Sequence, residues 1–321
     1  MAVFIAMDEP DQGAPGPDFL CIGMGKSGTG WLYDQFQHHP DFWMPPIKEI
    51  HYLERAFPNR VAKKILQADR DWRNNQRLKR GKRGLEDRDI AFVQEHEAAR
   101  RRPMNLEVYA GLFRLKNQQI SGDITPSYGT MPDDVIRRVM ARFPLLKIIL
   151  LVRDPISRAW SHFCMKHRGG KIQTEDLRDP DRFRALLQES KAVRTGSPAA
   201  IAQNWLDHVA VEQFRFYFFE DIVSKPADVR EHVMRFLGAN SELTSAVEPG
   251  RNRKAEKPKL EISDEIQTIL SDHFAKEIAA SAALFGSHAL DWAAKYGIAV
   301  PMNSRERLLQ PGSCNSGETS V

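Results

Sequence analysis

The sequence is poor in cysteine, with only Cys21, Cys164 and Cys314 among 321 residues. Three cysteines this far apart fit neither a disulfide framework nor a cysteine-based metal site. The ten histidines form no H-x-x-x-H pair and no cluster with cysteine of the kind that binds zinc. We therefore expect no metal site in this protein.

Long apolar stretches are also lacking. No window approaches the roughly 18 consecutive apolar residues that a membrane-spanning helix needs. The start of the chain, MAVFIAMDEPDQGAPGPD, lacks the basic and apolar regions of a secretion signal. These absences predict a cytoplasmic protein without a transmembrane segment.

The composition is typical of a globular protein, with 42% hydrophobic and 27% charged residues. A chain of this length can form one large domain. We expect a flexible lead-in over 1–17, a single domain over 18–300 and a disordered tail over 303–321. Within the domain, a densely charged stretch with little apolar periodicity predicts an exposed, basic helical insertion at about 60–110.

Apolar runs of strand length alternate with stretches of helical periodicity. Strands are predicted at Phe19–Gly23, Leu145–Val152 and Phe214–Phe219. The second run is continuous rather than alternating, which suits a strand that is buried on both faces of a parallel sheet. Helices are predicted at about 135–143, 156–167, 199–211 and 228–237, and from a cap at Ser263 onward. This order predicts a three-layer, P-loop-like α/β fold with a central, mainly parallel sheet flanked by helices.

A glycine-rich loop follows the first strand and reads Gly25-Lys26-Ser27-Gly28-Thr29-Gly30. Such a turn presents backbone N–H groups and the positive end of a helix dipole to an anion, and Lys26 adds a full charge. The ATP-binding motif G-x-x-x-x-G-K-[ST] would need glycine at position 20, where the chain has Leu20. The loop therefore predicts a phosphate site that is not of the ATP type.

A second anion site is predicted after the second long strand. Arg153 ends that strand and Ser161 lies eight residues on, so both can reach one anion at the start of the next helix. Alternatively, Arg153 forms a surface ion pair with Asp154.

The stretch Lys26-Ser27-Gly28-Thr29-Gly30-Trp31 resembles the K-S-G-T-T-W loop of sulfotransferases that use 3′-phosphoadenosine-5′-phosphosulfate (PAPS). The resemblance implies that Lys26 lies near the bridging oxygen of the phosphosulfate and that Ser27, Gly28 and Thr29 cradle the 5′-phosphate. Gly30 replaces the second threonine of the family. Trp31 matches an aromatic residue that stacks on adenine, although it equally fits a core position of the first helix.

The family motif also has an arginine and a serine at the spacing of Arg153 and Ser161, where they bind the 3′-phosphate. The cluster Arg251-Asn252-Arg253-Lys254 is similar to the basic loop that closes over the same phosphate. The resemblance therefore implies donor contacts from Arg251, Arg253 or Lys254. A solvated run of charge is the alternative.

The acceptor must lose a proton, which requires a base close to its hydroxyl. In Lys48-Glu49-Ile50-His51-Tyr52-Leu53, we expect an extended backbone that places Glu49 and His51 on one side. The segment resembles a K/N-E-x-H stretch of carbohydrate sulfotransferases of the heparan sulfate type, in which the glutamate is the base. The resemblance implies Glu49 as the base, His51 as the second candidate, and Lys48 in the site.

Another stretch of the same subgroup, G-E-K-T-P-x-Y, resembles Gly122-Asp123-Ile124-Thr125-Pro126-Ser127-Tyr128. It implies that Asp123, Thr125, Ser127 and Tyr128 form a wall near the acceptor. The acceptor is unknown, and the carbohydrate-like segment favours a saccharide or a lipid-linked molecule that carries a hydroxyl or an amine.

Two other functions fit parts of the sequence. An ATP-dependent P-loop kinase or NTPase would use Asp154 as a Mg²⁺ ligand, but the missing first glycine argues against it. A nucleic-acid or acidic-partner surface would use the basic stretch Arg77 to Arg83, whose low aromatic content disfavours single-strand binding. We therefore expect no nucleic-acid partner. The same insertion is alternatively a lid over the acceptor cleft.

Overall fold

The computed structural model describes residues 15–57, 61–67, 70–79, 81–190, 193, 196–243, 245–251 and 260–301. Its centre is a sheet whose strands run in the order β2-β1-β3-β4. The strands are β1 (Phe19–Gly23), β2 (Gly122–Ile124), β3 (Lys147–Val152) and β4 (Phe214–Phe218). All three pairings are parallel. The carboxyl ends of the strands therefore meet along one edge, where α/β folds place their ligands.

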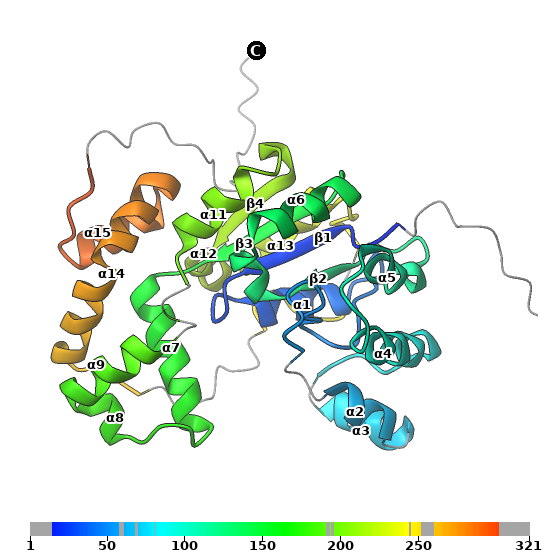
Figure 1. Ribbon diagram of the computed structural model, residues 1–321, viewed down its shortest axis with the longest axis horizontal. Coiled ribbons are helices and arrows are strands. Elements are labelled where there is room, and N and C mark those ends of the chain that lie inside the picture. The colour runs from blue at the N-terminus through cyan, green and yellow to red at the C-terminus, as the bar shows by residue number, and fades with distance from the viewer. Residues whose placement is uncertain are drawn as a thin grey trace, which may run out of the picture.

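Helices lie on both sides of this sheet, so the three-layer α/β prediction is confirmed (Figure 1). The helices are α1 (Thr29–Gln37), α2 (Val61–Gln67), α3 (Arg70–Lys79), α4 (Asp87–Ala99), α5 (Leu106–Gly111), α6 (Asp133–Arg142), α7 (Pro155–Arg168), α8 (Glu175–Arg178), α9 (Pro180–Glu189), α11 (Pro198–Leu206), α12 (Phe219–Ser224), α13 (Pro226–Leu237), α14 (Asp264–Phe285) and α15 (His288–Lys295). Short 3₁₀ helices are η1 (Arg114–Lys116), η2 (Pro126–Thr130) and η3 (Val211–Gln213).

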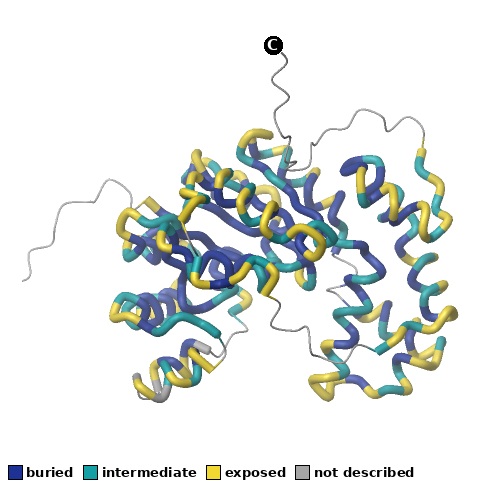
Figure 2. The backbone as a smooth tube through the Cα atoms, turned by 180° about the vertical axis from the view of Figure 1, so that it is seen from behind, coloured by how far each residue is buried: buried dark blue, intermediate teal, exposed yellow. Residues whose placement is uncertain are grey.

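Alternate residues of β3 face opposite layers, because side chains along a strand repeat every second residue. Ile149 and Leu151 pack with α1, α12 and α13. Ile148, Leu150 and Val152 join the larger core on the other side, which includes residues of α4 to α7, α11 and α14. All five are fully buried, so the continuous apolar run is explained by a strand covered on both faces (Figure 2).

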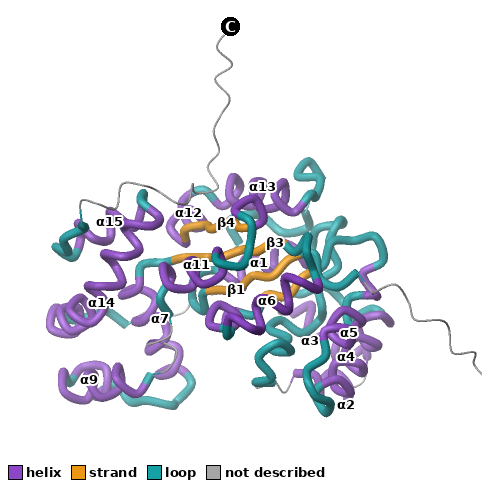
Figure 3. Tube along the Cα trace, turned by 45° about the horizontal axis from the view of Figure 1, so that its top comes forward, coloured by secondary structure: helices purple, strands orange, loops and turns teal. Residues whose placement is uncertain are grey.

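The predicted elements are present, with shifted ends. The strand predicted from Leu145 begins at Lys147, and Leu145 itself is 86% exposed. The helix predicted over 199–211 ends at Leu206. Ser263 caps α14 as expected, because its Oγ accepts a hydrogen bond from the Ile266 N–H. The helices α7, α9, α14 and α15 gather at one end of the strand band, and α2 to α5 lie at the other end (Figure 3).

The basic insertion is helical, but it is only partly exposed. Phe92 and Val93 of α4 are fully buried in the core. Arg77 is only 8% exposed, and its Nε donates to the Arg83 carbonyl at 2.9 Å. Arg83 donates to both carboxylate oxygens of the buried Asp89, at 2.6 and 2.7 Å. These arginines hold the α3–α4 connection to the domain instead of forming a free basic surface.

The ends of the chain fall mostly outside the described residues. The expected lead-in overlaps them only at Pro15–Pro17, where the Gly16 carbonyl accepts a hydrogen bond from Lys116 at 3.0 Å. The expected tail over 303–321 lies entirely outside them. Among the helices described, none is long and apolar enough to cross a membrane.

Candidate functional site

The glycine-rich loop lies at the carboxyl edge of the sheet, between β1 and α1. The Met24 N–H donates to the Leu151 carbonyl of β3 at 2.8 Å, which ties the start of the loop to the neighbouring strand. Lys26 and Gly28 have positive φ angles of 76° and 102°. A side chain on Gly28 would also approach Ile222 Cδ1 to 2.9 Å, so glycine is required there. The loop thus turns sharply and begins α1 with its first-turn N–H groups at the strand edge.

Ser27 fits a phosphate site. Its side chain is fully buried, and its hydroxyl has no hydrogen-bond partner among the described residues. A buried hydroxyl without a partner costs free energy unless a ligand or water satisfies it. Gly30, the second residue of α1, has open space where a Cβ would lie. The loop therefore has a buried polar atom and free space for an anion.

Arg153 connects the end of β3 to this loop. Its Nη1 donates to the Lys26 carbonyl at 2.8 Å, and its guanidinium carbon lies 4.2 Å from the centre of the Phe219 ring. Burial lowers the pKa of Arg153, although the charge of Glu220 opposes this shift. Arg153 is thus a partly buried cation next to the glycine-rich loop.

Asp154 was considered as the partner of Arg153 in a surface ion pair, but it is buried and acts as a helix cap. Its side chain caps α7 by accepting from the Ile156 N–H at 2.9 Å. Ser161, the other predicted contact of the 3′-phosphate, is half-buried in the second turn of α7.

Trp31 joins α1 to the segment that precedes the predicted basic loop. Its Nε1 donates to the Pro249 carbonyl at 2.7 Å. Arg251 is exposed beside Gly81, where a Cβ would come within 1.8 Å of Arg251 Nη2. Arg253 and Lys254 lie outside the described residues.

The segment that contains Glu49 and His51 is not extended, so the backbone prediction was wrong. Both residues have positive φ angles, 66° and 57°, because hydrogen bonds from other elements hold the backbone in tight turns. His96 Nε2 of α4 contacts the Ile50 carbonyl at 3.0 Å, and the Tyr128 hydroxyl accepts from the Leu53 N–H at 3.3 Å.

The two side chains nevertheless converge as expected. His51 Nε2 lies 3.6 Å from Glu49 Oε2, and Lys48 Nζ lies 2.6 Å from Glu49 Oε1. The other ring nitrogen of His51, Nδ1, bonds Glu54, which also accepts a hydrogen bond from Ser127 Oγ. We call these five residues the acidic cluster.

The charges of the acidic cluster set its protonation. For Glu49, burial would raise the pKa, but the hydrogen bond from His51 and the charge of Lys48 lower it to about 2. For His51, burial would lower the pKa, but the two glutamates raise it to about 9. At neutral pH Glu49 is therefore ionised and His51 is a cation, which favours Glu49 over His51 as the proton acceptor.

Asp123 lies beneath the acidic cluster and is fully buried. Its carboxylate accepts from Thr125 Oγ1 at 2.6 Å, from the hydroxyls of Tyr128 and Tyr109 at 2.8 and 3.1 Å, and from the Ile50 N–H at 3.4 Å. Thr125 and Tyr128 are also fully buried. These three side chains are therefore engaged within the protein, and their contact with the acceptor stays a prediction. They support the turn that carries Glu49, and Ser127 alone of the predicted wall is partly exposed.

The glycine-rich loop and the acidic cluster meet at η2. A Cβ on Gly25 would lie 4.0 Å from Pro126 Cβ, and the next residue, Ser127, bonds Glu54. The structure thus brings the predicted phosphate loop and the candidate bases together at one edge of the sheet.

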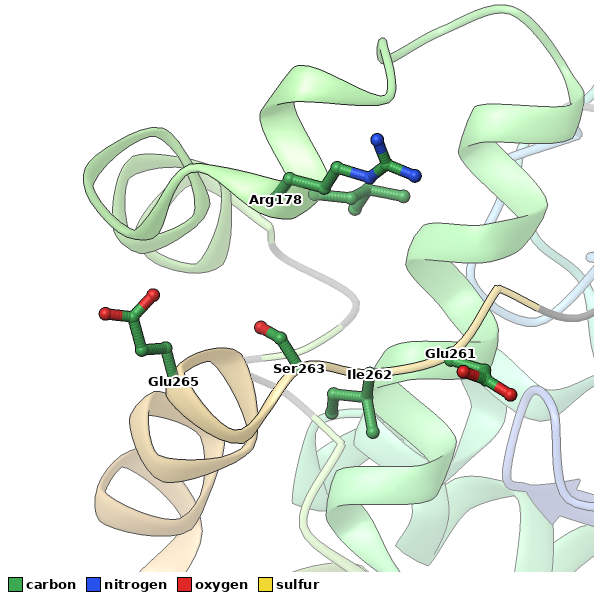
Figure 4. Close-up of a pocket in the computed structure, with 6 residues that line it drawn as sticks. Arg178, Glu261, Ile262, Ser263 and Glu265 are labelled. Atoms are coloured by element: carbon green, nitrogen blue, oxygen red, sulfur yellow. The ribbon is translucent and has the colours of Figure 1, made fainter.

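A separate cleft of about 380 Å³ lies between α8 and the start of α14 (Figure 4). Arg178 faces the segment that carries Glu261, Ile262 and Ser263 across this cleft. None of the predicted site residues lines it. In the ranges given above, no group of three or more histidine, cysteine, aspartate or glutamate side chains is placed to bind a metal ion.

Comparison with known proteins identifies the family. The model of the Sulfotransferase family matches residues 17–242. The chain belongs to the sulfotransferase family. The suspected resemblance to carbohydrate and bacterial sulfotransferases is thereby confirmed.

The sulfotransferase relatives include human heparan sulfate glucosamine 3-O-sulfotransferase 3B1, which is 31% identical over 231 residues, or 71% of this chain and 47% of the human protein. Mouse heparan sulfate glucosamine 3-O-sulfotransferase 6 is 32% identical over 238 residues, covering 71% of this chain and 54% of the mouse protein. This sulfotransferase chain thus spans about half the length of these relatives. The crystal structure of a sulfotransferase from Alicyclobacillus acidocaldarius shares the fold, with a TM-score of 0.55, 22% identity, and coverage of 83% of this chain and 94% of that one.

A membrane-associated sulfotransferase, kil1 from Dictyostelium discoideum, is 26% identical over 147 residues, or 46% of this sulfotransferase chain and 22% of kil1. The cytoplasmic location expected from the sequence stays a prediction.

Sequence reasoning missed Glu54 and His96. Glu54 lies three residues after His51, so only a turn brings the two together. His96 belongs to the insertion that was expected to be exposed, yet it is 3% exposed and contacts the Glu49 turn. No local pattern in the sequence distinguishes either residue.

Proposed function

We propose that this chain transfers a sulfuryl group from PAPS to a hydroxyl or amine of an acceptor by in-line displacement, with Glu49 as the general base. The observation that carries the proposal is the junction at η2, where the glycine-rich loop meets the acidic cluster. PAPS, when bound, supplies the sulfuryl group. Both partners of the transfer would then be held at one edge of the sheet.

On the donor side, the loop offers Lys26, the Ser27 hydroxyl and the first-turn N–H groups of α1 from Gly28, Thr29 and Gly30. Sulfuryl transfer, by analogy with phosphoryl transfer, requires positive charge and hydrogen-bond donors that stabilise the charge of the transition state. In this proposal the groups of the loop supply both. Arg153 and Ser161 would bind the 3′-phosphate, together with Arg251, Arg253 or Lys254. Trp31 would contact the adenine.

On the acceptor side, Glu49 is ionised and its side chain is 40% exposed, so it can receive the acceptor proton. His51 and Lys48 orient the carboxylate through their contacts with its two oxygens. A pKa of about 2 makes Glu49 a weak base in this state. Proton transfer would therefore accompany sulfuryl transfer, when the acceptor oxygen becomes more acidic.

The relatives named as heparan sulfate glucosamine 3-O-sulfotransferases support a carbohydrate hydroxyl as the acceptor. A lipid-linked saccharide would present the same group. The sequence departs from the subgroup at Asp123 and Ile124, and Asp123 is buried. The acceptor contacts of this chain would therefore come from Lys48, His51 and Ser127.

The kinase alternative would need Asp154 as a metal ligand. Asp154 instead caps α7 and also accepts a hydrogen bond from the Ser157 hydroxyl at 2.6 Å. The nucleic-acid alternative loses two of its basic residues, because Arg77 and Arg83 are engaged within the protein. Neither alternative is favoured by a specific observation.

The deciding experiment is a calorimetric titration with the desulfated product, 3′-phosphoadenosine-5′-phosphate, next to ATP with Mg²⁺. We expect metal-independent binding of the bisphosphate that weakens about 100-fold in Arg153→Ala, because a charge-assisted contact is lost. Arg215→Ala is the control, since Arg215 Nη1 donates to the Val211 and Phe214 carbonyls near the start of β4, away from the carboxyl edge of the sheet. A preference for ATP with Mg²⁺ would favour the kinase hypothesis and reject the proposal.

A further inference from the structure

The C-terminal helices end against the edge of the sheet that carries the predicted donor site. Tyr296, directly after α15, donates its hydroxyl hydrogen to Asp154 Oδ2 at 2.6 Å. Burial and the neighbouring Asp154 raise the pKa of Tyr296, so the hydroxyl keeps its proton and acts as the donor. Asp154 is the cap of α7 and the residue next to Arg153. Tyr296 therefore holds the start of the helix that bears Ser161.

Trp292 of α15 makes a second polar contact, to a residue that acts on Arg153. Its Nε1 donates to Glu220 Oε1 at 3.1 Å. The second oxygen of Glu220 is buried and has no partner among the described residues. Glu220 follows Phe219, on whose ring the Arg153 guanidinium lies, and its charge acts on Arg153. Trp292 thus fixes a carboxylate whose charge acts on this arginine.

These two hydrogen bonds are separate from the contacts that hold the helices in place. The ring of Trp292 packs against Phe218 with centroids 5.5 Å apart, and Phe285 of α14 packs against Phe216 at 4.8 Å. The helix pair would remain docked without the polar contacts, because the buried aromatic contacts persist. The hydrogen bonds therefore have a positional effect that can be separated from packing.

We propose that Tyr296 and Trp292 are positioning residues that hold Arg153 and the first turn of α7 in the arrangement that binds the 3′-phosphate of the donor. The proposal rests on the proposed function. Both residues lie outside residues 17–242, which the family model matches, so the proposal assigns a role in donor binding to a part of the chain beyond that match.

The test compares Tyr296→Phe and Trp292→Phe with the wild type. Each change removes one hydrogen-bond donor and keeps a ring. The control is Tyr217→Phe, which removes a hydroxyl that bonds His232 Nδ1 at 3.0 Å on the other face of β4. The ligands are 3′-phosphoadenosine-5′-phosphate and 5′-AMP, which lacks the 3′-phosphate, and thermal unfolding checks that each variant is folded.

We expect each of the two variants to bind the bisphosphate on the order of fivefold more weakly, with the affinity for 5′-AMP unchanged. The control should bind both ligands as the wild type does. If the two residues had a purely structural role, the variants would bind both ligands more weakly and to the same extent, and that result would overturn the inference. Unchanged bisphosphate affinity in both variants would also overturn it. A wild type that does not bind the bisphosphate would instead reject the proposed function itself, and the inference with it.

Discussion

The proposed donor and acceptor sides of the site are built differently. The donor side consists of regular elements, in which β1, the glycine-rich loop, α1 and the end of β3 place backbone groups and Arg153 along one edge. The acceptor side is an irregular turn around Glu49, held by side chains from α4, β2 and η2. Backbone geometry thus shapes the proposed anion site, and a network of side chains positions the proposed base.

This difference predicts different consequences for substitutions on the two sides. A change on the donor side removes one contact to the ligand and leaves the rest of the loop in place. A change on the acceptor side alters the protonation of several coupled groups, because His51 lies between Glu49 and Glu54. We therefore expect binding effects from the first side and effects on turnover and titration from the second.

The largest effect is expected for Glu49→Gln. Removing the base should lower kcat by roughly 10²- to 10⁴-fold, and calorimetry should show unchanged affinity for 3′-phosphoadenosine-5′-phosphate. The assay follows bisphosphate release from PAPS with heparan sulfate as acceptor. The control is Glu107→Gln, which removes an exposed acid paired with Arg142 away from the site. Turnover that survives in Glu49→Gln would place the base elsewhere.

The second effect concerns the protonation of His51. Glu54→Gln should lower the His51 pKa, now about 9, by about one unit or more, because a carboxylate that favours the charged ring is lost. The pKa of His51 in the folded protein lies above its ordinary value of 6.5. The His51–Glu54 pair therefore stabilises the folded protein fully below pH 6.5. This stabilisation is lost as the pH rises through about 9. The advantage of wild type over Glu54→Gln in free energy of unfolding should therefore shrink above neutral pH.

An NMR titration of the His51 ring measures this pKa directly. Glu97→Gln serves as the control, because Glu97 pairs with Arg100 on α4, whereas the described acidic partners of His51 are Glu49 and Glu54. An unchanged His51 pKa in Glu54→Gln would show that Glu49 alone raises the pKa of His51.

The smallest effect is expected for Ser27→Ala. Its hydroxyl has no partner among the described residues, so its removal should leave the free energy of unfolding unchanged or slightly higher. Bisphosphate affinity should nevertheless fall about fivefold. Ser121→Ala is a matched control, since its hydroxyl is also buried and lacks a described partner. Equal bisphosphate affinity in wild type and Ser27→Ala would remove Ser27 from the donor site.

Much of the donor side could be predicted from the sequence, because its signals are local. The apolar run of β1 lies directly before the glycines and lysine of the loop, and Arg153 directly follows the continuous apolar run of β3. Parallel pairing then brings β1 and β3 together at their carboxyl ends. The family comparison confirms the fold, and the individual donor contacts stay predictions.

The acceptor side and the C-terminal contacts depended on the tertiary structure. The sequence predicted that Glu49 and His51 share one site. It also predicted an extended backbone there, which the positive φ angles of both residues contradict. It placed Asp123 against the acceptor, whereas four hydrogen bonds enclose it in the core. The bond from Tyr296 to Asp154 joins residues 142 positions apart. Local periodicity determines strands and helices, whereas contacts between distant side chains are decided only when the chain packs.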